Sequence, residues 1–168
     1  MSDRSKKIFF ALVVIVPFLI YCFYYYGMMI KNAPYRFSDF DSMSIQYGPV
    51  DSLVNKYDSK TGDYQYVNKR DSLVKMHLRL TQDDLLYLHR KAADLGFWDF
   101  PANELADTAK GRKDKSIRYI IEFKYKKKSK RVVFDSEYVG DPRLIDANKN
   151  LIKEIEQSLL TAEERLKK

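Results

Sequence analysis

An uninterrupted apolar stretch near the amino terminus constrains this chain more than any other feature. Residues 8–30 contain no charged side chain over 23 positions. As a helix rising about 1.5 Å per residue, the stretch is roughly 34 Å long and can span a hydrocarbon core of about 30 Å. Pro17 lies inside it and predicts a kink that a membrane helix tolerates. The stretch therefore predicts a transmembrane signal-anchor helix that follows a cytoplasmic tail of residues 1–7.

The charges on either side of this stretch predict its orientation. The first seven residues carry three cations against one anion, whereas only Lys31 and Arg36 follow the stretch before a neutral-to-acidic run. Cations are enriched on the cytoplasmic side of membrane helices. We therefore expect the amino terminus in the cytoplasm and the rest of the chain outside it, in the periplasm if the cell is Gram-negative.

Three other interpretations of the stretch remain open but are disfavoured. It is longer than the central region of a cleaved signal peptide, about 7–15 residues, and no small-x-small cleavage site follows it. Lipidation of Cys22 as a lipoprotein would need a small preceding residue, where this chain has Tyr21. A buried helix of a soluble protein is the third interpretation, and the length of the stretch argues against it.

The rest of the chain is long enough for one domain. We expect a tether over residues 31–42 and a single extracytoplasmic domain over residues 43–168. Cys22 is the one cysteine of the sequence and lies in the apolar stretch. The domain therefore has no thiol for a disulfide, a thiolate metal site or a cysteine nucleophile.

Periodicity and turn residues predict an α+β domain. Strands are expected over residues 44–47, 50–57, 64–68, 72–80, 116–126 and 131–135. A helix is expected from Thr81 to Gly96, and another after Asp141 and Pro142, whereas residues 102–115 are expected to form a loop. The predicted architecture has two layers, an antiparallel sheet made of a meander plus a hairpin, with two helices on one face.

The strand over residues 72–80 has the clearest alternation of apolar and polar side chains. Its apolar face is expected to pack on the stripe of the following helix. The residues of these two faces are Val74, Met76, Leu78 and Leu80 on the strand, and Leu85, Leu88, Ala92 and Leu95 on the helix.

The positive charge of the chain is concentrated in one segment. The net charge is +7, and residues 110–131 alone hold eleven cations and two anions, so the remainder of the domain is net negative. The cations nearest the predicted hairpin turn are Lys124, Lys126, Lys127, Lys128, Lys130 and Arg131.

Three interpretations of this basic hairpin are open. The residues favour a solvated sheet edge on which lysines prevent strand-to-strand aggregation. Contact with anionic lipid headgroups or another polyanion is the second. Nucleic acid is disfavoured, because Phe123 and Tyr125 are expected on the face opposite Lys124 and because the domain is expected outside the cytoplasm.

No standard catalytic motif is present. The sequence lacks a glycine-rich phosphate loop, an H-E-x-x-H and a G-x-S-x-G. His77 and His89 are expected to be partly exposed and hydrogen-bonded, and recurring Asp-Ser pairs are typical of turns. We therefore predict no catalytic residue, metal or cofactor, although a hydrolase that uses two carboxylates stays open as an alternative.

The order of the predicted elements resembles a known class of small extracytoplasmic domains. These domains have no assigned function, occur in Bacteroidetes-type bacteria and are often lipoproteins. The resemblance rests on residues 78–101, in which the helix closes on Gly-Phe-Trp, on the hairpin of residues 116–135 and on the closing helix. It implies a binding or scaffolding domain of the cell envelope that contacts the membrane or another envelope protein, and it carries over no functional residue.

Overall fold

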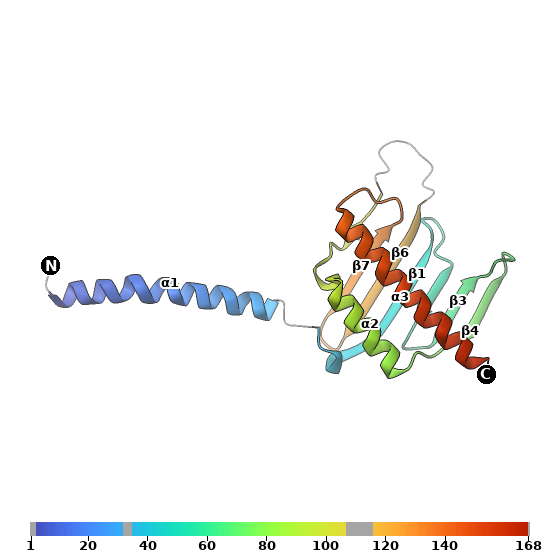
Figure 1. The fold of residues 1–168 in the computed structure, drawn as a ribbon, viewed down its shortest axis with the longest axis horizontal. Coiled ribbons are helices and arrows are strands. Elements are labelled where there is room, and N and C mark those ends of the chain that lie inside the picture. Colours follow the sequence, from blue (N-terminus) through green and yellow to red (C-terminus); the bar gives the residue numbers. More distant parts are fainter. Residues whose placement is uncertain (1–2, 32–34, 107–115, 168) are drawn as a thin grey trace. The chain divides into compact units, whose positions relative to one another are not determined.

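The computed structural model describes the backbone of residues 3–31, 35–106 and 116–167; within the first range it describes the side chains of residues 4, 9–10 and 12–26. The chain forms two compact units, Met1–Pro34 and Tyr35–Lys168. Each unit is described by itself (Figure 1).

The first unit is one long helix, α1 (Asp3–Lys31), with Pro17 inside it. It begins before the apolar stretch and includes much of the predicted cytoplasmic tail. Its described apolar side chains are exposed, among them Phe10 and Phe23 at about three-quarters each. Within the described residues, no helix combines the length and the hydropathy of a membrane span.

The second unit contains a sheet that has seven strands over the described residues. Their spatial order is β4-β3-β2-β1-β6-β7-β5. The strands are β1 (Phe40–Pro49), β2 (Asn55–Asp58), β3 (Asp63–Val67), β4 (Leu73–His77), β5 (Asn103–Glu104), β6 (Ile117–Tyr125) and β7 (Ser129–Asp135). All neighbouring pairs are antiparallel except β5 with β7, which is parallel.

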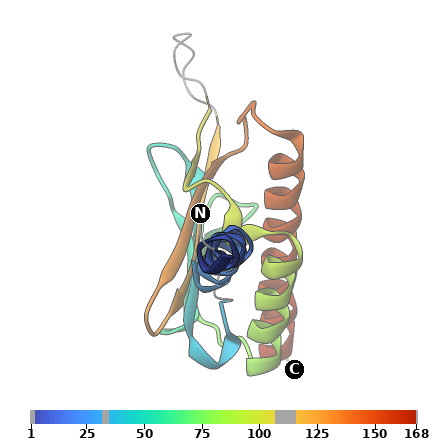
Figure 2. The ribbon, with the colours of Figure 1, turned by 90° about the vertical axis from the view of Figure 1, so that its left-hand side faces the viewer.

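Two helices cover one face of this sheet, α2 (Gln82–Asp94) and α3 (Pro142–Leu166), as Figure 2 shows. Short 3-10 turns η1 (Phe37–Asp39) and η2 (Phe97–Asp99) precede β1 and follow α2. The α+β class and the two-layer arrangement are confirmed. The wholly antiparallel sheet is wrong, because β5 adds a parallel edge strand within the predicted loop of residues 102–115. Residues 107–115 of that loop lie outside the described part of the chain.

The helix ends form as the sequence predicts. The Thr81 hydroxyl accepts from the Asp84 amide while the Asp84 carboxylate accepts from the Thr81 amide, which completes a capping box. Gly96 has a left-handed backbone with φ of 77°, which only glycine adopts at little cost. Asp141 accepts from the amide of Arg143, so it caps α3 directly before a proline.

The predicted packing of strand 72–80 on the helix that follows it, α2, is confirmed for Leu78 and Leu80 but not for Val74 and Met76, which are only partly buried and lie outside the core. Leu78 and Leu80 belong to the same buried core as Leu88 and Ala92. On the opposite face of that strand, Lys75 is exposed. The strand itself is shorter than predicted and ends at His77.

The tether predicted over residues 31–42 is wrong in its second half. Tyr35 already belongs to the second unit, and Phe40 opens β1. Residues 32–34 lie outside the described part of the chain. The strand predicted over residues 50–57 is also shorter, because a turn in which the Ser52 amide donates to the Pro49 carbonyl delays β2 to Asn55.

Candidate functional site

An aromatic cluster fixes the beginning of the second unit. We define it as Tyr35, Phe37, Phe40, His89, Trp98 and Tyr125. The Tyr35 ring stacks on Trp98 with centroids 4.4 Å apart and lies 5.0 Å from Tyr125. The cluster thus joins the segment before β1 to α2, η2 and β6, which lie far apart in the sequence.

His89 is the titratable group at the centre of this cluster. It is buried, and its Nδ1 lies 2.9 Å from the hydroxyl of Tyr125. Burial, helped by Arg90, lowers the pKa of His89, and burial raises the pKa of Tyr125, so both side chains are neutral near pH 7. The predicted partial exposure of His89 is therefore wrong. His77, by contrast, is exposed and accepts from Arg79 as its place on the polar face predicts.

The basic turn, which we define as Lys126, Lys127 and Lys128, lies against this cluster. The Nζ atom of Lys128 sits 3.9 Å from the centre of the Tyr35 ring, a cation–π contact. Lys126 donates to the carbonyl of Ser38 at 3.4 Å. The turn therefore packs on the segment through which the chain enters the domain.

The structure divides the six predicted cations among three environments. Lys124 and Arg131 lie on the face of the sheet that α2 and α3 leave open, opposite the buried Phe123. Lys130 lies on the helix side, donates to the carbonyl of Phe100, and has its pKa lowered by burial. Among these six cations, the three of the basic turn are consecutive in sequence and all exposed. β5 borders β7 only at Val133 and Phe134, so the half of β7 nearest the turn has no further strand beside it among the described residues, and the interpretation of this hairpin as a solvated sheet edge stays open.

A second cluster gathers polar side chains at the opposite end of β6 and β7. The Asp135 carboxylate is fully buried and accepts from Arg118 at 2.7 and 2.9 Å and from the Ala106 amide at 3.0 Å. Burial acts to raise the pKa of Asp135, but the hydrogen bonds from Arg118 and Ala106 outweigh it and hold this pKa below its usual range. Asp135 is therefore an ionised, paired carboxylate.

Glu104 on β5 and Asn148 on α3 form a second buried polar pair, on the opposite face of β7 from Asp135, and we call the two pairs together the buried polar cluster. Both side chains are fully buried, and Asn148 Nδ2 donates to Glu104 Oε2 at 2.8 Å. Burial raises the pKa of Glu104, against smaller opposing effects of Lys130 and Asn148. The other oxygens, Glu104 Oε1 and Asn148 Oδ1, have no hydrogen-bond partner among the described residues.

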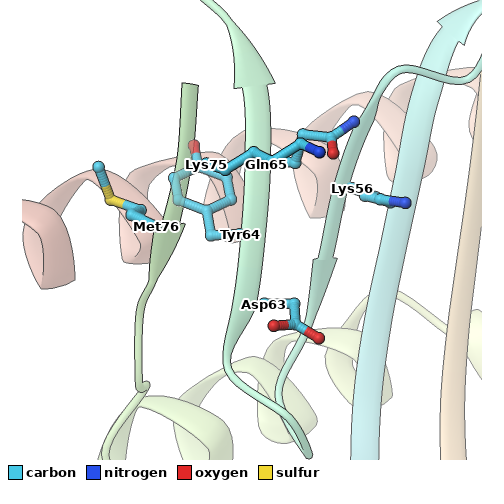
Figure 3. A pocket seen from close by; sticks show the side chains of 6 residues that line it. All are labelled: Lys56, Asp63, Tyr64, Gln65, Lys75 and Met76. Atoms are coloured by element: carbon cyan, nitrogen blue, oxygen red, sulfur yellow. The ribbon is translucent and has the colours of Figure 1, made fainter. Parts of the chain in front are cut away.

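A shallow depression lies over β2, β3 and β4 (Figure 3). Its volume is about 220 Å³, and it is lined by Lys56, Asp63, Tyr64, Gln65, Lys75 and Met76. One carboxylate between two lysines is not the pair of facing carboxylates that glycoside hydrolysis requires. In the described part of the chain, no group of His, Cys, Asp and Glu side chains is arranged to hold a metal ion.

No protein-family model, curated protein or solved structure matches this chain.

Both clusters contain residues that the sequence did not single out. Glu104 was assigned to a loop, and nothing in its neighbours distinguishes a buried glutamate from a solvated one. The sequence offers a weak indication that Tyr35 packs on the domain, since three aromatic residues occur between positions 35 and 40 in an otherwise polar segment.

Proposed function

We propose that this chain is a single-pass membrane protein of the cell envelope, with an extracytoplasmic domain that acts as a binding or scaffolding module at the bilayer surface. In this proposal α1 is the anchor and its amino terminus is cytoplasmic. Two observations support the anchor. Residues 8–30 carry no charge, and the described apolar side chains of α1 are exposed to their surroundings.

The packing of Tyr35 in the aromatic cluster is the observation that carries the proposal. Four peptide links separate Lys31, the last residue of α1, from Tyr35. With Cα atoms about 3.8 Å apart, these links reach at most about 15 Å, well below the roughly 40 Å expected of a twelve-residue tether. Few residues therefore separate the last residue of α1 from Tyr35, the ring that Lys128 of the basic turn contacts.

This placement favours anionic lipid headgroups as the partner of the basic turn. Each cation near an anionic membrane contributes about 1 kcal/mol, and the attraction is screened over about 8 Å at physiological salt. Lys126, Lys127 and Lys128 are all exposed, and Arg36 follows Tyr35 directly. Nucleic acid finds no comparable support, because Phe123 and Tyr125 are buried in the core and unable to stack on bases.

A vesicle-binding experiment tests the lipid contact. Residues 35–168 contain the whole buried core, so this fragment is expected to fold without α1. We expect it to float with vesicles containing phosphatidylglycerol at low salt, and to be released as salt rises. Changing Lys126, Lys127 and Lys128 to Gln is expected to abolish flotation.

A matched control removes the same charge elsewhere. Changing the exposed Lys56, Lys69 and Lys75 to Gln leaves the basic turn intact and should preserve flotation. Equal losses from both triple variants would show that net charge alone drives binding, and would overturn the assignment to the turn.

A reporter fusion tests the orientation separately. Alkaline phosphatase joined after Lys168 is active only outside the cytoplasm, so we expect an active fusion. An inactive phosphatase together with an active cytoplasmic reporter at the same position would refute the proposed topology.

A further inference from the structure

We propose that Glu104 is a buried proton-binding site, and that its protonated carboxyl group forms a two-bond acid–amide pair with Asn148. In this pair Asn148 Nδ2 donates to Glu104 Oε2, and a proton on Glu104 Oε1 donates to Asn148 Oδ1. The inference does not depend on the membrane anchor or on the basic turn.

The orientation of the Asn148 amide is fixed by a second contact. Its Nδ2 donates to the carbonyl of Leu144 at 2.9 Å as well as to Glu104 Oε2 at 2.8 Å. A backbone carbonyl only accepts, so the atom facing it must be the nitrogen. Asn148 Oδ1 is therefore an acceptor, and it faces a site where no described residue supplies a donor.

One proton satisfies both oxygens that lack a partner. Glu104 and Asn148 already share one hydrogen bond. If Glu104 were ionised, Glu104 Oε1 and Asn148 Oδ1 would both remain buried acceptors without a donor. Each would lose its hydrogen bonds to water without gaining a donor in the folded domain. A carboxylic acid supplies the missing donor, because its hydroxyl lies on the same planar group as the oxygen that Asn148 already contacts.

The charges around Glu104 do not supply a counter-ion in direct contact. Lys130 on β7 is the described cation whose field favours ionised Glu104, but its Nζ is directed to the carbonyl of Phe100. Arg118 on β6 is committed to Asp135, the carboxylate that follows Phe134 on β7. On α3, the described contact of Glu104 is the uncharged Asn148. Burial therefore outweighs the attraction of Lys130.

The pair has a structural consequence for the edge of the sheet. β5 has two residues and joins the sheet only through β7. The Glu104–Asn148 contact fastens this short strand to the first turns of α3. Loss of the proton would leave a carboxylate facing an amide oxygen, so β5 is expected to detach from α3 when Glu104 ionises.

Isotope-edited infrared spectroscopy of the full chain in detergent micelles tests the protonation state directly. We expect a carboxylic acid C=O band at about pH 6, where an ordinary glutamate is almost fully ionised. The band should be absent from the Glu104→Gln variant and should shift in Asn148→Leu, which removes its hydrogen-bond partner. A native spectrum that shows only carboxylate bands at about pH 6 would overturn the proposal.

A second measurement uses stability, because Glu104→Gln retains both hydrogen bonds without a titrating group. We expect the two urea midpoints to agree at about pH 4, where the glutamate of the unfolded chain is also largely protonated, and the native midpoint to fall below that of Glu104→Gln as pH rises, because only the unfolded native chain then releases its proton. Parallel pH profiles for the two proteins would contradict a proton on Glu104.

Discussion

The two ends of the β6–β7 hairpin hold their charges in opposite ways. At the turn, aromatic rings form the packed layer, and the cations of the basic turn lie outside it; the Lys126 side chain is 67% exposed. At the far end, the carboxylates of Glu104 and Asp135 are inside, both fully buried. This part of the sheet therefore holds exposed cations at the turn, and buried carboxyl groups that depend on internal hydrogen bonds at the far end.

This difference separates binding from stability. Exposed ion pairs contribute about 0–1 kcal/mol, whereas breaking a buried pair costs about 3–5 kcal/mol because one charge is left without compensation. Changes at the basic turn should therefore alter contacts with partners, and changes in the buried polar cluster should alter folding. The predictions below test that separation.

The largest effect is expected from Asp135→Ala. It removes the acceptor of Arg118 and of the Ala106 amide, so we expect the free energy of unfolding to fall by about 3–5 kcal/mol in urea titrations. The matched control is Asp41→Ala, which breaks the exposed pair with Lys60 and should cost less than about 1 kcal/mol. Equal losses would mean that the buried polar cluster does not stabilise the domain.

An intermediate effect is expected from Tyr35→Ala at the turn end. Loss of its stacking on Trp98 should cost about 1–2 kcal/mol. Because Trp98 is the single tryptophan, its fluorescence should shift to longer wavelength as water reaches the ring. Tyr35→Phe keeps the stacked ring and should leave both readouts unchanged, so a shift in that variant would point to the hydroxyl instead.

The two ends should respond to pH with opposite sign. The pKa of His89 is lowered from 6.5 in the folded domain, so its contribution is complete above pH 6.5 and is lost as pH falls below it. The pKa of Glu104 is raised from 4.5, so its contribution is complete below pH 4.5 and is lost as pH rises through the folded value. Each limb has a slope of at most about 1.4 kcal/mol per pH unit.

Single-site variants show which residue causes each part of the pH dependence of stability. His89→Gln is expected to flatten the acidic limb, and Glu104→Gln the alkaline limb, in urea titrations between about pH 5 and pH 9. A variant that flattens the opposite limb, or neither, would break the comparison between the two ends.

The smallest effect on stability is expected from Lys127→Gln. Its side chain is exposed at the tip of the basic turn, so the free energy of unfolding should change by less than about 0.5 kcal/mol. Vesicle flotation should nevertheless weaken. A loss of stability without a change in flotation would assign the turn to folding rather than to binding.

Local chemistry predicted those parts of the fold that local contacts determine. Thr81, Asp84 and Gly96 mark helix ends through bonds to their own neighbours, and alternation correctly placed Phe123 and Lys124 on opposite faces. The strand order has no such local signal, so the parallel pairing of β5 with β7 was not predicted.

The candidate sites depend on contacts between distant residues. Glu104 and Asn148 are 44 positions apart, and β5 is too short to show any periodicity. The basic turn was found because adjacent lysines are visible in sequence, but its neighbour Tyr35 was not. The anchor, the topology and the lipid contact stay predictions.

The stacking of Tyr35 on Trp98 has a consequence for how weak a useful membrane contact can be. In an anchored protein, a short link makes headgroup binding by the turn an intramolecular event. Its effective concentration at the surface is then about millimolar or higher. Lysines can bind lipid too weakly to bring a free domain to the membrane. In an anchored domain, the same lysines would still determine which face is turned toward the bilayer. Lengthening the link between Lys31 and Tyr35 would dilute that preference without altering a single contact within the domain.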